Sequence, residues 1–409
     1  MSSGFPKLKG ASPSDLVAES RLQFFSSGTP TCAASLDFDL AKRIEEWGSL
    51  RSRMAKTVVP GFSRDEWAYM VLTLDADHLW KPILEHFGNP VDGSTAGPTK
   101  VFRPKDPVAV WLSNNVSLLG PLMLIYLSLS GSRLRLKTGT RSGDLLNPFL
   151  RFVISELPNS DLAKYLETQV QVLNFSREDS RNAELASTAA VRIAFGSSDG
   201  VAQIHALPHS VESTEIAFSN RRSVVWMEPG VADEHVDSLI KVFNIYGQAG
   251  CTSPSRVFLI GGTAKDATDL RNRICQRWTK IVSQRPEAYL ASSNFLAFQH
   301  ARALGWDARL VEENRALIAC GPLGLDPFEG HLALPITYAT IGEALRELPP
   351  NVQTLGHAGT MANAKAWFRS AAGSGIKRFV PLSAMHHFGH TWDGLPYWRM
   401  LFDEVSVQL

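Results

Sequence analysis

Cysteine is scarce in this sequence of 409 residues, and neither sign of charge is in excess. The four cysteines are Cys32, Cys251, Cys275 and Cys320. They lie far apart without a CxxC pair, which excludes a dense disulfide framework and favours free thiols in a reducing compartment, so we expect a cytoplasmic protein. The formal net charge of +1 provides no field that would hold a polyanion, so we expect no nucleic-acid partner.

A long hydrophobic run is also missing. The most apolar stretch, residues 116–129, is shorter than the ~20 residues that a membrane-spanning helix needs, and it contains Pro121. We therefore expect a buried helix there and no membrane span. Lys7 and Lys9 are followed by no apolar region, so a secretory signal is not expected.

The sequence does have a globular composition, with 44% hydrophobic and 20% charged residues and enough length for two domains. In the N-terminal part, apolar residues at three-to-four spacing predict helices, and a segment rich in Gly and Pro then predicts a connector. The predicted helices are 13–25, 39–54 and 63–84, and the connector is 88–98.

Strand and helix patterns alternate after the connector. Residues 107–112 and 134–137 are strand-like and flank the apolar helix 118–129, which predicts a βαβ unit of a parallel sheet with cofactor sites at the strand ends. Further strands are predicted at 169–173, 191–195, 224–227, 257–260, 308–311, 316–320 and 333–338, and a helix at 264–283. The alternation predicts an α/β protein with two α/β units.

The segment around Cys251 carries the most chemical information. The thiol follows a Gly-Gln turn and precedes the strand-like residues 256–260, so it lies where an element ends and a loop begins. Such a thiol can face a cleft, and backbone N–H groups around it can lower its pKa and make it a nucleophile. Attack on a thioester carbonyl creates an oxyanion that needs hydrogen-bond donors. Cys275 and Cys320 lie in apolar runs and are interpreted as core residues.

Four parts of the chain resemble a known family. They are 113–116 (Ser-Asn-Asn-Val), 195–200 (Phe-Gly-Ser-Ser-Asp-Gly), 248–254 (Gln-Ala-Gly-Cys-Thr-Ser-Pro), and the C-terminal pieces 378–382 and 392–394. The third part resembles the nucleophile segment of the aldehyde dehydrogenase superfamily, Phe-x-Asn-x-Gly-Gln-x-Cys, with one more residue between Gln248 and Cys251 than that pattern has. Within the superfamily, the closer resemblance is to the LuxC-like acyl-CoA reductases.

The resemblance implies an α/β, aldehyde-dehydrogenase-like fold with a Rossmann-type cofactor domain and an α/β catalytic domain. We accordingly expect an N-terminal helical region and nucleotide-binding domain at 1–222, a catalytic domain at 223–380, and a C-terminal tail at 381–409 that packs on the body. The resemblance also implies that Cys251 is the nucleophile, and that the amide of Asn115 joins the Cys251 backbone N–H in holding the oxyanion. The alternative for Asn115 is a turn-forming amide at a strand end.

The basic segment after the second predicted strand is the expected cofactor site. In aldehyde dehydrogenases the matching strand ends in a lysine that touches the adenosine ribose, and a glutamate three residues later often binds both ribose hydroxyls. Here Lys137 is followed by Thr140 and Arg141, so the carboxylate that repels a 2′-phosphate is absent and donors for it are present. The pattern favours NADPH, and Gly196 with Ser197 is a candidate phosphate-side turn. The alternative is that these basic residues form a solvated face.

Two further patterns limit the chemistry. Aldehyde-oxidising relatives carry a water-activating glutamate in a Glu-Leu-Gly-Gly-Lys motif, which this sequence lacks; Glu215 and Glu228 fall near its spacing without the flanking glycines. The absence favours a thioester-linked reaction, because a water-activating base would hydrolyse the acyl-enzyme. His386, His387 and His390 have no ligand cluster beside them, so we predict no metal site and expect the group to border the acyl site.

These observations lead to the hypothesis of an NADPH-dependent acyl thioester reductase, which forms a thioacyl-cysteine intermediate and releases an aldehyde. Two alternatives stay open: an acylating aldehyde dehydrogenase running oxidatively, and a non-reducing component that uses Cys251 only as a covalent acyl carrier. The resemblance implies an acyl-CoA or acyl-carrier substrate, an acyl-activating synthetase as a partner, and a homo-oligomer.

Overall fold

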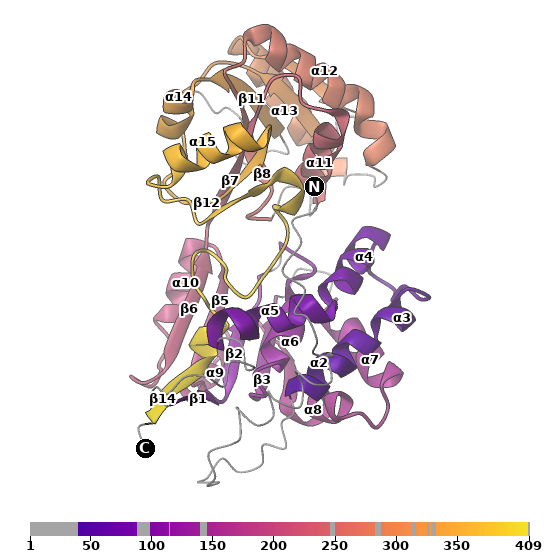
Figure 1. The fold of residues 1–409 in the computed structure, drawn as a ribbon, viewed down its shortest axis with the longest axis vertical. Helices are drawn as coiled ribbons and strands as arrows, with labels where there is room; N and C mark the ends of the chain where they lie inside the picture. The colour runs from indigo at the N-terminus through magenta and orange to yellow at the C-terminus, as the bar shows by residue number, and fades with distance from the viewer. Residues whose placement is uncertain are drawn as a thin grey trace. The chain divides into compact units, whose positions relative to one another are not determined.

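In the computed structural model the chain forms two compact units (Figure 1). The residues that it describes are 40–87, 99–113, 115–139, 145–245, 250–282, 288–311, 316–324, 328 and 333–407. Unit 1 comprises Met1–Ser219, Gly389–Thr391 and Leu395–Leu409, and unit 2 comprises Asn220–Phe388 and Trp392–Gly394. The C-terminal segment therefore contributes residues to both units.

Unit 1 contains a five-stranded sheet with the strand order β4-β3-β2-β5-β6, and all of its strand pairs are parallel. The strands are β2 (Val108–Trp111), β3 (Leu134–Thr138), β4 (Val170–Asn174), β5 (Val191–Gly196) and β6 (Thr214–Ser219). The chain runs outward from β2 through β3 to β4, and then returns to the other side of β2 for β5 and β6, as in a Rossmann fold. This reversal makes a topological switch point between β2 and β5.

Helices connect these strands. They are α6 (Leu119–Ser128), α7 (Leu146–Glu156), α8 (Asp161–Gln169), α9 (Arg181–Thr188) and α10 (Ser198–His205). All 10 residues of α6 are buried, which explains why its sequence is apolar on every side. The predicted βαβ unit of 107–112, 118–129 and 134–137 is therefore confirmed, and so is the buried helix.

Further helices precede the sheet of unit 1. They are α2 (Leu40–Ser49), α3 (Arg51–Met54), α4 (Arg64–Thr73) and α5 (Ala76–Phe87). The prediction of one helix over 63–84 is wrong, because the chain leaves helical geometry between α4 and α5. A capping box fixes the start of α4: the Glu66 N–H donates to Ser63 Oγ, and the Ser63 N–H donates to Glu66 Oε2. The predicted helix 13–25 and connector 88–98 lie outside the described residues.

The end of the chain returns to unit 1. A 3₁₀ turn at Arg399–Leu401 leads into β14 (Phe402–Val407), which pairs antiparallel with β1 (Thr99–Pro104) in a separate two-stranded sheet. Trp398 is fully buried, and its indole N–H donates to the carbonyl oxygen of Tyr126 on α6 at 3.0 Å. This contact ties the C-terminal segment to the core of unit 1.

Unit 2 contains a seven-stranded sheet with the order β13-β12-β7-β8-β11-β10-β9. The strands are β7 (Arg222–Met227), β8 (Pro254–Ile260), β9 (Asp307–Val311), β10 (Ala316–Cys320), β11 (Ala333–Ala339), β12 (Val352–Ala358) and β13 (Arg378–Pro381). Every pair is parallel except β9 with β10. The strands predicted between 224 and 338 are confirmed. Strands β12 and β13 are additional to the prediction.

Helices cover both faces of the unit 2 sheet (Figure 1). They are α11 (Asp233–Asn244), α12 (Ala264–Ile281), α13 (Ala288–Ala303), α14 (Ile341–Arg346) and α15 (Met361–Ala371). Successive side chains of a strand point to opposite faces, and β7 follows this rule. Val225 packs in one core with residues of α11 and α12, whereas Trp226 packs in another with residues of α14 and α15. Unit 2 is therefore a three-layer α/β structure.

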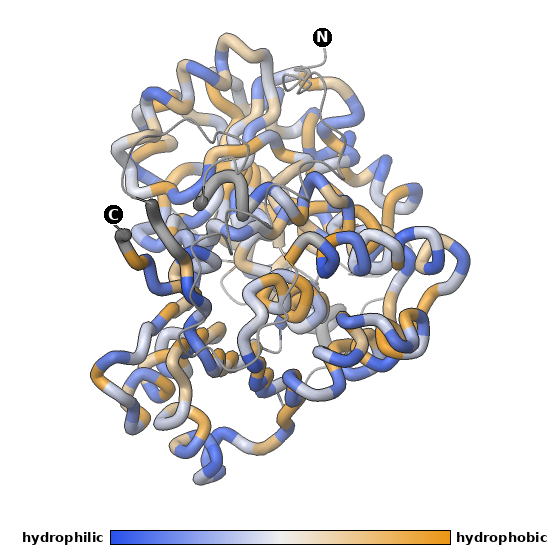
Figure 2. The backbone as a smooth tube through the Cα atoms, turned by 60° about the horizontal axis from the view of Figure 1, so that its bottom comes forward, coloured by the Kyte–Doolittle hydropathy of each residue, from blue (hydrophilic) through white to orange (hydrophobic). Residues whose placement is uncertain are grey.

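Hydropathy varies along the helices in the way that packing against a sheet requires. Hydrophobic and hydrophilic residues alternate along most of them (Figure 2), which is typical of helices with one buried face. Within the described ranges, no helix combines the length and the apolar character needed to cross a bilayer.

An ion pair between neighbouring strands lies in the sheet of unit 1. The side chain of Arg192 on β5 is 1% exposed, and its Nη2 lies 2.6 Å from Oε2 of Glu215 on β6. The same carboxylate oxygen lies 2.8 Å from Nδ1 of His205 at the end of α10. Nη1 of Arg192 donates to the carbonyl oxygen of Ile204. Glu215 therefore compensates a buried cation.

Replacement of Glu215 by alanine is expected to lower the free energy of unfolding by about 3 kcal/mol, because Arg192 would keep its buried charge without a counter-ion. Urea unfolding of the purified protein measures the change. Glu167→Ala, which removes an exposed carboxylate from α8, is the control, and its effect should stay within about 0.5 kcal/mol. Equal effects of the two substitutions would contradict the structural role of Glu215.

Candidate active site

The carboxyl edge of the unit 1 sheet collects the predicted cofactor residues. Asn115 follows β2, Lys137 lies near the end of β3, and Gly196 ends β5 with Ser197 next in the chain. Because parallel strands end at the same edge, these residues share one side of the sheet. The switch point between β2 and β5 lies between the Asn115 turn and the Gly196 turn, which is where open α/β sheets bind ligands.

Asn115 is exposed in the turn that leads from β2 into α6. Two residues later, the hydroxyl of Ser117 donates to Oε1 of Glu66. The other oxygen of Glu66 completes the capping box at Ser63. One carboxylate therefore holds both the start of α4 and the turn that carries Asn115, and this fixes the backbone from which the predicted oxyanion donor projects.

Lys137 is buried at the edge of this sheet, with 9% of its surface exposed. Its Nζ donates to the carbonyl oxygen of Thr138 at 3.2 Å and lies 5.4 Å from the centre of the Phe175 ring. Burial lowers the pKa of Lys137, the nearby Arg177 lowers it further, and Glu178 acts in the opposite direction. The lysine is therefore a desolvated cation held over an aromatic ring, rather than part of a solvated face.

Arg177 is a cation that sequence analysis did not single out. It is exposed just after β4, and it lies close enough to Lys137 to affect the charge of that lysine. The two residues thus lie near the carboxyl ends of neighbouring strands, in the part of a Rossmann fold that recognises the ribose of a dinucleotide. Thr140 and Arg141, the other predicted ribose-side residues, lie outside the described residues.

The Gly196–Ser197 turn has the features of a phosphate site. Ser197 is the N-cap of α10, and its Oγ accepts the N–H of Gly200 at 3.1 Å, which leaves the hydroxyl proton available for donation. A Cβ built on Gly196 meets no atom within 4 Å, so the backbone there is open to close approach. Phosphate groups bind at such helix starts because backbone N–H groups and the helix dipole favour an anion. The residues present therefore fit the phosphates of a nicotinamide nucleotide.

Cys251 lies at the amino edge of the unit 2 sheet, in a turn before β8. The turn is closed by a hydrogen bond from the Ser253 N–H to the Gly250 carbonyl oxygen at 2.9 Å. The carbonyl oxygen of Cys251 accepts the hydroxyl of Ser223, at the start of β7, at 2.6 Å. The position at an element boundary agrees with the prediction. Residues 246–249, which include Gln248 of the motif, lie outside the described part of the chain.

The thiol of Cys251 is not activated in this arrangement. Burial raises its pKa to about 11, and the negative charge of Asp393 acts in the same direction, whereas Gln353 and Arg378 oppose them. A backbone hydrogen bond at Cys251 does lower this pKa, as expected, but burial outweighs it, so the net pKa is raised. The turn precedes β8 and not a helix, so the element that follows Cys251 provides no helix dipole to lower the pKa of the thiol.

The imidazole ring of His386 holds the turn that contains Cys251. Its Nε2 lies 2.8 Å from the carbonyl oxygen of Val242 and its Nδ1 lies 2.5 Å from Oγ1 of Thr252. Burial lowers the pKa of His386 to about 4, so the ring is neutral, with Nε2 as donor and Nδ1 as acceptor. Within the described ranges, no group of three or more His, Cys, Asp or Glu side chains is placed to hold a metal ion.

Glu228 lies at the opposite edge of the same sheet from Cys251. It follows β7, whose length of roughly 17 Å separates the two edges. Its Oε1 accepts the N–H of Thr360 at 2.7 Å and the amide of Asn363 at 2.6 Å, so it binds the start of α15. Glu215 is engaged with Arg192 in unit 1. Both glutamates near the oxidative spacing therefore have structural partners.

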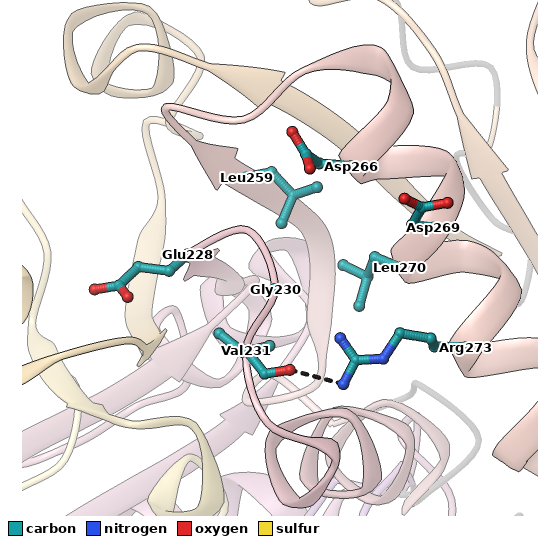
Figure 3. Close-up of a pocket in the computed structure, with 8 residues that line it drawn as sticks. All are labelled: Glu228, Gly230, Val231, Leu259, Asp266, Asp269, Leu270 and Arg273. Atoms are coloured by element: carbon teal, nitrogen blue, oxygen red, sulfur yellow. Dashed lines mark hydrogen bonds between the residues drawn. The ribbon is translucent and has the colours of Figure 1, made fainter.

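A small pocket of about 80 Å³ opens at the carboxyl edge of the unit 2 sheet (Figure 3). Three of its polar side chains, those of Glu228, Asp266 and Arg273, are already engaged in the fold. Asp266 completes the capping box of α12 with Thr263, and Arg273 donates to the carbonyl oxygen of Val231 at 2.7 Å and pairs with Asp233. These contacts explain the polar lining, and the pocket lies on the edge that Cys251 does not occupy.

Solved structures of aldehyde dehydrogenases and other oxidoreductases share this fold. An oxidoreductase from Marinobacter aquaeolei is 12% identical, with a TM-score of 0.67 over 97% of this chain and 90% of that chain. Aldehyde dehydrogenase 21 from Physcomitrella patens, solved with the reaction product succinate, is 14% identical, with a TM-score of 0.67 over 97% and 90%. The indole-3-acetaldehyde dehydrogenase of P. syringae, solved with NAD⁺ and IAA, is 10% identical, with a TM-score of 0.60 over 97% and 88%. These likenesses establish an aldehyde-dehydrogenase-like fold, as predicted.

No curated protein sequence matches this chain significantly. The chain does match a family model, that of the acyl-CoA reductase (LuxC) family. The match covers residues 94–318, which is more than half of the 409 residues. The matched region contains Asn115, Lys137 and Cys251. The resemblance seen in the sequence is therefore confirmed, and the chain is an oxidoreductase that belongs to the LuxC acyl-CoA reductase family.

Proposed function

We propose that this protein reduces an acyl thioester to an aldehyde with NADPH, through a thioacyl intermediate on Cys251. The observation that carries the proposal is the position of Cys251, in a fixed turn at the amino edge of a parallel sheet and inside the region matched by the LuxC family. The carboxyl edge of the unit 1 sheet, with its phosphate-binding turn and its buried lysine, supports the use of a nicotinamide nucleotide.

Cys251 performs the first half-reaction. Its thiolate attacks the acyl carbon of an acyl-CoA or acyl-carrier thioester, the bond from that carbon to the leaving sulfur breaks, and the released thiolate takes up the proton that Cys251 has lost. The Asn115 amide and the Cys251 N–H hold the oxyanion of the tetrahedral intermediate. Because the pKa of the resting thiol is about 11, loss of its proton is part of the acylation step.

Reduction of the acyl group follows at the same sulfur. When bound, the nicotinamide supplies a hydride to the thioacyl carbon. Lys137 would hold the adenosine ribose, and Ser197 with the N–H groups of α10 would hold phosphate. The carbon becomes a thiohemiacetal on Cys251, the bond from carbon to Sγ breaks, the aldehyde leaves, and the released thiolate takes up a proton from water to restore the thiol.

The structural partners of Glu215 and Glu228 favour reduction of the thioacyl group over oxidation of an aldehyde to an acid. Hydrolysis of a thioacyl intermediate needs a base that activates water. Glu215 binds Arg192 and Glu228 binds the start of α15, so neither carboxylate is placed for that task. The thioacyl group then persists until it is reduced or returned to a thiol.

Cys251→Ala is expected to abolish thioester-dependent NADPH oxidation and the acyl adduct together, because the covalent step needs the sulfur. Absorbance with a panel of acyl-CoAs measures the oxidation, and mass spectrometry locates the adduct. Cys275→Ala, which removes a thiol of α12, is the control and should retain both signals. An adduct without oxidation would instead indicate a covalent acyl carrier, or the need for an acyl-activating synthetase to deliver the acyl group. Activity that survives in Cys251→Ala would refute the mechanism.

Arg177→Ala is expected to raise the KM for NADPH about tenfold and to leave the KM for NADH nearly unchanged, because one charge-assisted hydrogen bond to the 2′-phosphate is lost. Steady-state kinetics with both nucleotides measures the effect. Arg133→Ala is the matched control, since Arg133 pairs with Asp106 at the other end of β3. Equal changes in the two KM values for Arg177→Ala would show that this residue does not recognise the 2′-phosphate.

A further inference from the structure

Polar side chains from separate segments of unit 2 gather beside Cys251. They are Arg221 before β7, Gln353 on β12, Arg378 on β13, and Asp393 in the Trp392–Gly394 segment. Gln353 is completely buried and Asp393 is 4% exposed. Buried groups of this kind cost free energy unless each of them is paired. Their arrangement around a thiol therefore needs an explanation.

Asp393 is held in place by its backbone as well as by its partners. Its φ is 52°, in the left-handed region, and the following Gly394 has a φ of 74°. The guanidinium of Arg378 lies 4.7 Å from the centre of the Trp392 ring and donates to the carbonyl oxygen of Met385. A non-glycine residue adopts positive φ at some cost, which the surrounding contacts must offset. The segment thus directs a carboxylate into the buried edge of the sheet.

The amide of Gln353 connects this carboxylate to the nucleophile. Its Nε2 donates to Oδ1 of Asp393, and its side chain lies close enough to Cys251 to lower the pKa of the thiol as a hydrogen-bond donor. An amide nitrogen carries two N–H donors, which is enough for both bonds. Because the amide oxygen would be repelled by the Asp393 carboxylate, the carboxylate determines which end of the amide faces the sulfur.

The oxygen atom of the Gln353 amide shows that this orientation destabilises the fold. Within the described part of the chain, Oε1 of Gln353 is buried and has no hydrogen-bond partner. A buried acceptor without a donor destabilises a protein, because its lost hydration is not replaced by a hydrogen bond. Stability alone does not account for a glutamine placed in this way, and such groups are often found where a site has a function.

We propose that Gln353 is the hydrogen-bond donor to the Cys251 thiolate during acylation, and that Asp393 positions this donor and places a negative charge beside the sulfur. The proposal rests on the role of Cys251 as the nucleophile of the proposed function. Gln353 acts on the sulfur directly, whereas Asp393 acts through Gln353 and through its charge.

The charges that face Cys251 determine the sign of each effect. Asp393 raises the pKa of Cys251, and Gln353 and Arg378 lower it. Arg221 Nε lies 3.5 Å from Oδ2 of Asp393 and offsets part of the negative charge. His386 on the other side of the turn is neutral, because burial lowers its pKa to about 4. Loss of the donor and loss of the carboxylate should therefore change the reactivity of the thiol in opposite directions.

Alkylation of Cys251 by iodoacetamide, followed by mass spectrometry from about pH 6 to 10, tests this on the full-length protein. At pH 8 the rate should fall about five- to tenfold in Gln353→Met, because the thiolate loses its donor, and rise about tenfold in Asp393→Asn, where the acceptor for Gln353 remains and the charge does not. Because the resting pKa of Cys251 is about 11, the rate should still be rising at pH 10 in the wild type and in Gln353→Met, whereas Asp393→Asn should reach any given rate at lower pH than the wild type.

Matched variants separate this effect from a general disturbance of the fold. Gln276→Met on the exposed side of α12 and Asp269→Asn at the far edge of unit 2 should leave the rate unchanged, and Cys251→Ala gives the background from other thiols. Thermal unfolding checks that each variant is folded; if Gln353→Met is not, Gln353→Glu replaces it and should also slow alkylation. Rates that change in the same direction in the Gln353 and Asp393 variants, or that do not change, would overturn the proposal.

This readout needs neither nucleotide nor acyl thioester. Opposite shifts in alkylation without any reductase activity or acyl adduct would therefore refute the proposed function and leave the Gln353 and Asp393 assignment intact. Reductase activity that depends on Cys251, combined with unchanged alkylation in both variants, would support the proposed function and overturn the Gln353 and Asp393 assignment.

Discussion

The parallel pairing of strands determines where most of the described candidate functional groups lie. In unit 2 the ladder from β13 through β12 and β7 to β8 brings four strand starts to one edge, and these starts carry Arg378, Gln353, Ser223 and the turn of Cys251. In unit 1 the ladder that joins β3, β2 and β5 brings Lys137, Asn115 and Ser197 to one edge in the same way. Because side chains alternate between faces along a strand, a register shift of one residue would turn the neighbours of Cys251 to the other face.

The electrostatics around Cys251 describe a thiol that is protonated at rest. Burial and the carboxylate of Asp393 both oppose ionisation, and Gln353 and Arg378 compensate only in part. Since the thiolate is the form that reacts with oxidants, a protonated thiol is protected between turnovers. The Cys251 thiol therefore loses its proton during the catalytic cycle and not in the resting protein. The neutral His386 is consistent with this, because both of its ring nitrogens hold the backbone and hydroxyl groups around the turn.

Helices and strands whose own residues show a clear hydrophobic pattern were predicted correctly. Helix α6 is buried on every side, so its apolar run identified it, and the strands on either side of it alternate with it as a βαβ unit requires. The helix predicted over 63–84 was split because the break between α4 and α5 leaves the apolar spacing almost intact. Strand β12 was missed for a different reason: its sequence contains Gln353 and Thr354, which are buried, and buried polar residues make a strand read as a loop.

The sequence by itself determined the α/β class, the family, and the candidate nucleophile, because each of these depends on residues that are close together in the chain. Only the tertiary structure decided the surroundings of that nucleophile. Gln353, Arg378 and Asp393 lie far from Cys251 in sequence, and although Arg378 and Asp393 belong to segments that resemble the family, no local pattern places them beside the thiol. Arg177 comes near Lys137 only because β3 and β4 are neighbours. Hydrophobic periodicity is a property of a segment, whereas the pKa of a buried thiol depends on charges that the fold brings together from separate segments.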